Sequence, residues 1–326
     1  MSSKEQATFA SLGFDVHRRP TRKHEFLRRM NEVIPWEELV REVEPYYPKG
    51  EGRGRPAKPL IWMLKLYFLQ LWHGLSDPQT EDQAHDSHAV QEFLGIDLGK
   101  DRPPDETTIC KFRHLLERRG LGKRLFERVK EYLKERGIRI EKGTIVDATI
   151  IEASGSRKNQ KRQRDPEMGA TRKGQNWYFG MKMHVGVDAD GKWIHSVEVT
   201  PANVHDSQVV EKLLHGKEKA VYGDRAYIGQ EGKIRAKAPR AKVRIERRAG
   251  RGRPLSEREK ERNRRRARIR CRVEHVFGVM KHVFGWVKVR FRGLAKNRQW
   301  AFMMAAAVNL YFMSKALGQG GKLVRT

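Results

Sequence analysis

The spacing of the apolar residues changes at Gly143, and this change restricts the chain to two differently built parts. Before it, apolar residues recur at the spacing of amphipathic helices. After it, the segment Thr144–Ile151 (TIVDATII) is rich in β-branched residues and predicts a strand. We therefore expect a helical region over residues 21–140, followed by an α/β domain over residues 141–317.

The α/β domain is predicted to hold a mixed sheet, because short strands and helices alternate along it. The polar, basic stretch 155–175 is expected to be a long mobile loop, residues 1–20 a flexible arm and residues 318–326 a tail. A hairpin turn is predicted at Asp188–Gly191. Further strands are expected over 178–187, 192–199, 219–222 and 242–245, and a helix over 204–214 with Asp206 or Ser207 near its cap.

The N-terminal region carries recognisable helix starts in a basic setting. Pro59 precedes an apolar run over 60–71, and Asp105 is placed to cap the next helix. Several short basic helices are typical of a DNA-binding module, of which a helix-turn-helix variant is one form. The alternative is that they only support the catalytic domain. The most apolar stretch, 300–317, is short for a membrane span, so we expect a buried helix and no membrane association.

The charge balance points to a polyanionic partner. The chain has 68 Lys and Arg against 40 Asp and Glu, a net charge of +28, which repels itself unless a polyanion neutralises it. Nucleic acid is the usual polyanion, ahead of a ribosome-type structural role or a membrane surface. The segment 244–272 holds fourteen basic residues against four Glu and is predicted to track phosphates, a solvated helical face being the alternative.

Cysteine usage and the N-terminus indicate a cytoplasmic protein. Cys110 and Cys271 form neither a metal-ligand pattern nor a disulfide framework, which fits a reducing compartment. The first twenty residues lack the apolar run of a signal peptide. We therefore expect the protein in the cytoplasm, where bacterial DNA also lies.

Chemistry at a phosphodiester needs carboxylates that hold divalent cations, so we searched for acids in unusual places. Asp147 lies in the middle of an almost uncharged strand, although Asp is a poor strand former. Asp224 ends the apolar strand before it, where ligands bind in open α/β sheets. Its rivals are Asp188 and Asp190, which suit a turn, and Asp206, a helix cap.

Glu274 is the only acidic residue between Arg262 and Thr326. Arg270 and Lys281 follow the same helical spacing, so the three side chains are expected on one helix face. There, Glu274 would bind metal and the two cations would hold DNA phosphate. The alternative for Glu274 is a structural ion pair with Arg270.

Lys182 and three histidines lie near these acids in the predicted elements. Lys182 and His184 share a strand face and could border the site, and His205 could reach it beside Asp206. Histidine suits softer metals than Mg²⁺, so His184, His205 and His275 are more typical of structural or phosphate contacts.

Several collinear stretches have a recognisable pattern: TRKHEFLRRM, VEPYYPK, TTICKFRHLLE, GTIVDATIIEA, QRDPEM, NWYFGMKMHVGVDA, ANVHD and LLHGKE. With them, the chain resembles bacterial insertion-sequence transposases of the IS-five family, in the IS-four-like DDE group. The resemblance implies a ribonuclease-H-like catalytic domain with Asp147, Asp224 and Glu274 as catalytic triad and metal ligands. It also implies a Tyr-Arg-Glu-Lys signature, in which Ala267 stands at the Tyr position and puts a Tyr-mediated contact in doubt.

Two RGRP tetrapeptides are similar to the core of an AT-hook, whose arginines enter a narrow minor groove. They contain Arg53 and Arg55, and Arg251 and Arg253. A plain basic linker is the simpler interpretation of both.

We therefore expect a Mg²⁺-dependent DNA transposase, with Mn²⁺ as the alternative ion. It would bind the terminal inverted repeats of its element, cut the ends, and transfer the 3′-hydroxyl strand to target DNA. Because two ends must be joined together, a homodimer or larger assembly on DNA is expected. The alternatives are a nuclease of the same fold that only hydrolyses, and a non-catalytic DNA-binding derivative.

Overall fold

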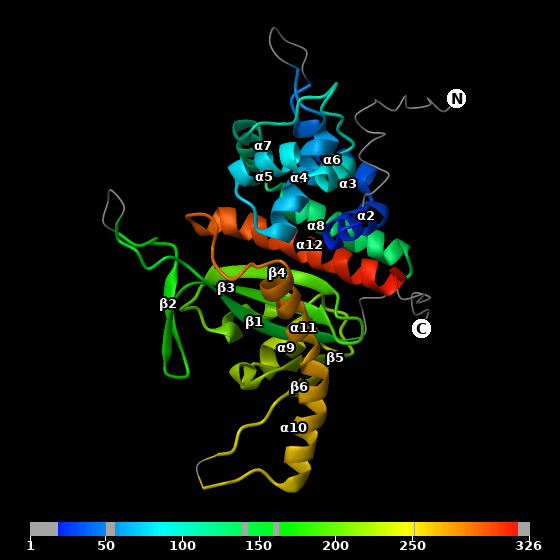
Figure 1. Cartoon of the computed structure of the whole chain (residues 1–326). Helices are drawn as coiled ribbons and strands as arrows, with labels where there is room; N and C mark the ends of the chain where they lie inside the picture. The colour runs from blue at the N-terminus through cyan, green and yellow to red at the C-terminus, as the bar shows by residue number, and fades with distance from the viewer. Residues whose placement is uncertain (1–18, 50–55, 139–142, 159–162, 251, 319–326) are drawn as a thin grey trace.

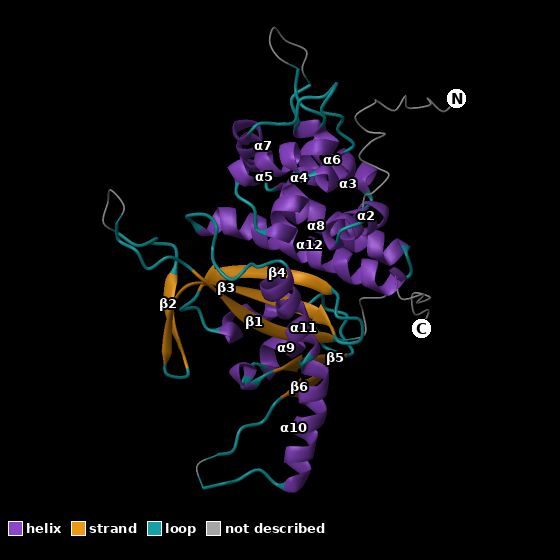
Figure 2. Cartoon of the chain, in the orientation of Figure 1, coloured by secondary structure: helices purple, strands orange, loops and turns teal. Residues whose placement is uncertain are grey.

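A computed structural model describes residues 19–49, 56–138, 143–158, 163–250 and 252–318 (Figure 1). The predicted DNA contacts Arg53, Arg55 and Arg251 lie outside these ranges, as do most of the expected arm and tail. The N-terminal region is helical, as predicted (Figure 2). Its helices are α2 (Arg22–Val33), α3 (Trp36–Val43), the short 3₁₀ helix η1 (Glu44–Tyr46), α4 (Leu60–His73), α5 (Asp77–Asp86), α6 (His88–Leu94), α7 (Glu106–Arg118) and α8 (Leu121–Glu135).

Helix starts follow the local sequence. Asp105 caps α7 as predicted, because its Oδ1 accepts a hydrogen bond from the Thr108 N–H at 2.7 Å. Ser76 and Gln79 form a reciprocal capping box at the start of α5. Such caps satisfy backbone N–H groups that a helix leaves unpaired at its start, so each fixes where a helix begins.

The α/β layer is a six-stranded mixed sheet in the order β2-β3-β1-β5-β6, with β4 also paired to β3. The β1–β3, β2–β3 and β3–β4 pairs are antiparallel, whereas β1–β5 and β5–β6 are parallel. This confirms the predicted mixed α/β class. The strands are β1 (Thr144–Glu152), β2 (Gly169–Lys173), β3 (Asn176–Asp188), β4 (Ile194–Pro201), β5 (Ala220–Gly223) and β6 (Lys242–Ile245).

The remaining helices surround this sheet (Figure 1). α10 leaves the sheet on the side away from the helical layer, and α12 runs between the two layers. The full set of these remaining helices is the 3₁₀ helices η2 (Asp206–Leu213) and η3 (Arg225–Tyr227), α9 (Glu231–Lys237), α10 (Glu257–Arg270), α11 (Arg272–Gly278), the π-helical turn η4 (Val279–Val283) and α12 (Leu294–Gly318).

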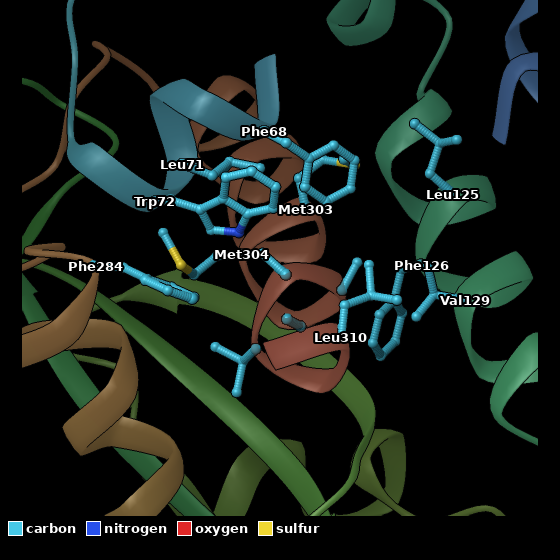
Figure 3. Packing of buried hydrophobic residues seen from close by; sticks show 14 of the residues in the cluster. Phe68, Leu71, Trp72, Leu125, Phe126, Val129, Phe284, Met303, Met304 and Leu310 are labelled. Atoms are coloured by element: carbon cyan, nitrogen blue, oxygen red, sulfur yellow. The ribbon is translucent and has the colours of Figure 1, made fainter. Parts of the chain in front are cut away.

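α12 is the core helix shared by both layers. It packs against α8 on one side and β4 on the other. Figure 3 shows Met303, Met304 and Leu310 of α12 among side chains of α4 and α8. Residues 294–317 have the length and mean hydropathy, 1.2, of a membrane-crossing helix, but 72% of the apolar window is buried inside the protein. The expectation of a buried helix is confirmed.

Two expectations about the α/β domain were wrong. The stretch 155–175 is not one loop, because β2 lies within it and pairs with β3. Its root is also fixed: Asp165 and Glu167 accept hydrogen bonds from the Gly293 and Leu294 N–H groups at the start of α12, at 2.6 and 2.7 Å.

The second error concerns the single helix face expected to carry Arg270, Glu274 and Lys281. Arg270 ends α10 and Glu274 lies in α11, but the backbone stays helical at Cys271 and the two side chains still approach each other at i,i+4 spacing. Lys281 lies in the π-helical turn η4, which changes the angular spacing, so Lys281 leaves the face that the other two share.

The helix expected over 204–214 is present as the 3₁₀ helix η2, Asp206–Leu213. His205 caps it and Asp206 and Ser207 follow the cap directly, which confirms that expectation.

Asn309 of α12 ties the helix to the sheet. Its Nδ2 donates to the Ile194 carbonyl at 2.8 Å, and its Oδ1 accepts from the Ile194 N–H at 2.9 Å. We predict that Asn309→Ala lowers the free energy of unfolding by about 2–4 kcal/mol, because two buried backbone groups lose their partners. Urea titration followed by circular dichroism measures this. Exposed Lys296→Ala, on the same helix, is the control, and equal stability of both variants would contradict the prediction.

Candidate active site

The strand register places three carboxylates side by side. β1 pairs with β5 at Ile145–Tyr222, and β5 pairs with β6 at Gly223–Ile245. Continuing both registers brings Asp147, Asp224 and Glu246 into one row across the sheet. Side chains two residues apart point to the same face of a strand. The predicted meeting of Asp147 and Asp224 therefore follows from parallel pairing of their strands.

Asp147 lies in an environment that disfavours its charge. Its side chain is 18% exposed, and its Oδ1 accepts a hydrogen bond from the Ala148 N–H at 2.8 Å. Burial is the main reason that the pKa of Asp147 is raised to about 6, and the charge of nearby Asp224 raises it further. Arg270 acts in the opposite direction. A bound cation would relieve this cost.

Asp224 follows β5 directly and caps η3. Its Oδ1 accepts from the Ala226 N–H at 2.9 Å. The Glu246 N–H donates to the Gly223 carbonyl at 3.1 Å, which holds the end of β6 against the end of β5. The loop conformation at Asp224 is thus fixed by backbone contacts on both sides.

Arg270 spans this carboxylate row. Its Nε lies 3.0 Å from Glu246, one terminal nitrogen lies 3.4 Å from Asp147, and the other lies 4.0 Å from Glu274. The guanidinium therefore compensates the negative charge that the row concentrates. The expected contact between Arg270 and Glu274 is present, but it is the longest of the three.

Glu274 reaches outward from α11, with 65% of its side chain exposed. Lys281 turns instead toward the strand, where its Nζ donates to the Ile150 carbonyl at 3.0 Å. Burial lowers the pKa of Lys281. Glu274 is therefore free to change rotamer, whereas Lys281 is fixed beside the end of β1.

Lys182 forms an ion pair with Asp206, at 2.9 Å, and donates to the Val204 carbonyl at 2.9 Å. His184 is fully buried, hydrogen-bonded to Thr200 at 2.8 Å, and burial lowers its pKa to about 4. The Lys182 ammonium group thus balances the negative charge of Asp206, which lies near Asp147. Both basic residues thus support the site from β3.

The two remaining predicted histidines are exposed: His205 caps η2 through Ser207, and His275 projects from α11. Asp188 is a turn residue, since its Oδ2 accepts from the Asp190 and Gly191 N–H groups. This confirms the expectation that the Asp188–Gly191 segment is a hairpin turn.

Sequence reasoning missed Glu246. The signal was present, because Glu246 ends the short strand β6 as Asp224 ends β5. A cavity of about 990 Å³ opens beside it, between β6, α9 and the chain that leads into α10. Arg253 lines this cavity, together with Arg225, Arg235, Arg247, Arg248 and Arg266.

The donor chemistry of the row suits a divalent cation. Asp147 and Asp224 are hard oxygen donors on adjacent strands, and burial makes the charge of Asp147 costly without a counter-ion. Among the described residues, no three acidic, histidine or cysteine side chains converge closely enough to hold a metal. Asp147 and Asp224 are therefore the described carboxylates whose positions on adjacent strands best suit a divalent cation.

Comparison with known proteins bears directly on this arrangement. Residues 139–310, more than half of the chain, match the family described as transposase DDE domain. The chain belongs to this family. It is a DNA transposase. Family membership implies polynucleotidyl transfer on DNA, and such domains generally use divalent metal ions. The mixed sheet fits the ribonuclease-H-like catalytic domain expected for the transposase.

Two further similarities were found. Residues 14–115 match a second family, described as transposase domain (DUF772). The transposase is also similar to a solved structure, the cryo-EM structure of the piggyBac transposase synaptic complex with hairpin DNA. The sequences are 10% identical, the TM-score is 0.48, and the match covers 93% of this chain and 79% of that chain.

We predict that Asp147→Asn stabilises the transposase in metal-free buffer at pH 8. The substitution removes a buried charge next to Asp224 and keeps an oxygen for the Ala148 N–H, so the gain should be about 2 kcal/mol. Thermal unfolding in the presence of a chelator measures it. Glu211→Gln, at an exposed position of η2, serves as control. A lower melting temperature for Asp147→Asn would show that its charge is not costly.

Proposed function

We propose that this transposase is an insertion-sequence enzyme of the IS-five family. It binds the terminal inverted repeats of its element, cuts at the ends, and transfers the 3′-hydroxyl strand to target DNA. The observation that carries this proposal is the placement of Asp147, within β1, beside Asp224, at the end of the parallel strand β5, with Arg270 next to Asp147. We also propose a cytoplasmic location and action as a homodimer or larger assembly, since two ends must be joined together.

Asp147, Asp224 and Glu274 are the proposed ligands of two Mg²⁺ ions, for which Mn²⁺ is the alternative. Bound there, the ions would neutralise phosphoryl oxygens and lower the pKa of the attacking hydroxyl group. Glu274 completes the set by turning inward from α11, which its exposed side chain permits. Arg270 is then released from Asp147 and is placed to bind a DNA phosphate, because arginine matches phosphate geometry.

The DNA path is proposed to run along α10. This helix carries eight basic and three acidic residues, and exposed Arg262, Arg264, Arg265 and Arg268 face solvent. Lys182 and His205 are proposed to contact DNA nearer the carboxylates, where Lys182 pairs with Asp206. We also propose that the N-terminal helices and both RGRP segments contact DNA.

Two other functions share the fold: a nuclease that only hydrolyses, and a DNA-binding derivative without activity. A joining assay with a pre-cut 3′-hydroxyl end separates them. A transposase inserts that end into target DNA, a nuclease does not, and the inactive derivative neither cuts nor joins. Terminal inverted repeats just outside the gene supply the natural substrate for this assay.

We predict that Glu274→Gln lowers cleavage and strand transfer at least ~100-fold, because a metal ligand is lost, while end binding changes less than about twofold. Cleavage of a labelled end and gel-shift binding measure the two effects. Glu261→Gln, the same change on α10, is the matched control. Glu246→Gln tests which glutamate is the third metal ligand. If Glu246→Gln abolishes cleavage and Glu274→Gln does not, Glu246 is the ligand and our assignment is wrong.

We predict that the double change Arg264→Ala and Arg268→Ala weakens binding to any duplex equally. Each lost phosphate contact reduces the dependence of log affinity on log salt by about 0.9, so the slope should fall by roughly 2. Binding titrations between low and moderate salt measure the slope. Unchanged slopes would place the DNA away from α10, and Lys296→Ala on α12 controls for loss of net charge.

A further inference from the structure

Trp177 is the most exposed large apolar side chain among the described residues. It is 70% exposed, whereas the next, Val283, is 50% exposed. Indole is among the largest apolar surfaces a residue carries, and tryptophan is highly buried on average. An indole held in solvent therefore indicates a surface that binds something.

The hairpin of β2 and β3 holds this indole in a fixed position. The two strands pair from Gly169–Gly180 to Lys173–Asn176, and Trp177 stands directly opposite Arg172. Figure 1 shows β2 projecting beyond the rest of the sheet. The root of the hairpin is anchored to the start of α12 by Asp165 and Glu167. Trp177 is thus presented on a braced arm.

The charges around the indole fit a polyanion. Arg172 and Lys173 are exposed on the neighbouring strand. The nearest acids in the sequence, Asp165 and Glu167, are engaged with backbone N–H groups of α12. Lys173 also lies close enough to Lys281 to affect it electrostatically, and Lys281 contacts β1, the strand of Asp147. Positive charge is therefore present both on the hairpin and beside β1.

An aromatic face flanked by cations is the combination that binds unpaired nucleotides. Bases stack on the ring and the cations hold the adjoining phosphates. Within a duplex the base faces are covered by their neighbours, so the indole has access only to an unpaired or extruded base. A second protein would instead require an apolar patch, whereas the turn that precedes Trp177, residues 173–176, holds only polar residues and glycine.

We infer that Trp177 stacks on an unpaired base of the DNA that the transposase processes, while Arg172 and Lys173 bind the adjoining phosphates. This inference rests on the proposed function and adds to it a site for a distorted or frayed DNA end. The base lies on the β2–β3 hairpin, and the scissile phosphate lies at the carboxylate row.

The test compares two labelled probes in metal-free buffer: a fully paired 30-mer, and the same duplex with four unpaired thymidines at one end. The full-length protein should prefer the forked probe. Trp177→Ala should lower affinity for the forked probe about tenfold and leave affinity for the paired probe within twofold, whereas Trp177→Phe retains the preference. Val283→Ala is the matched control at another exposed apolar position.

The outcomes separate this inference from the proposed function. If wild type binds both probes equally, or if Trp177→Ala weakens both equally, the stacking site is wrong while DNA binding stands. If Trp177→Ala changes the molecular mass by light scattering but not the probe preference, the indole belongs to a protein interface, and the inference is again overturned. Selective loss on the forked probe, with an unchanged melting temperature, supports it.

Discussion

Repulsion between the neighbouring carboxylates of Asp147 and Asp224 is the constraint on which the rest of the site depends. Parallel pairing of β1 with β5 forces the two side chains together, and burial makes the charge of Asp147 costly. Arg270 compensates part of this charge from the end of α10. Without a fixed position for α10, the row would be left as a half-buried cluster of like charges. The chain continues from Arg270 through Cys271 into α11 and η4, from which Lys281 donates to the Ile150 carbonyl of β1.

Interactions elsewhere in the fold offset the unfavourable free energy of the carboxylate row. α12 contributes buried residues to both the helical layer and the sheet, and Asn309 locks its position against β4. The apolar surface buried along one such helix stabilises the fold by many times the few kcal/mol lost at a repelling acid pair. The helical region therefore has a structural role whether or not it also contacts DNA. The alternative readings of that region, support and DNA binding, are compatible.

Features that depend on residues close in sequence were predicted, whereas features that depend on distant residues were missed. The cap at Asp105, the strand around Asp147 and the buried helix over 300–317 depend on residues close in sequence, and each was predictable. β2 was missed because its composition, GATRK, is polar and its strand character comes only from pairing with β3. Glu246 was missed because its importance depends on register with a strand 22 residues earlier. Lys281 was wrongly placed on the helix face of Arg270 and Glu274 because a π-helical turn cannot be predicted from residue spacing.

The structure shows where part of the surplus positive charge lies. Two parts project from the sheet away from the helical layer, the β2–β3 hairpin and α10 with the chain that precedes it (Figure 1). Both carry exposed cations, and the carboxylate row lies on the sheet between their roots. On the proposed DNA path, a duplex that contacts both projections crosses the row, so the attraction that binds DNA would also bring a phosphodiester to the acids. Repulsion between the carboxylate row and the DNA phosphates then acts only at short distances, where salt screens charges least.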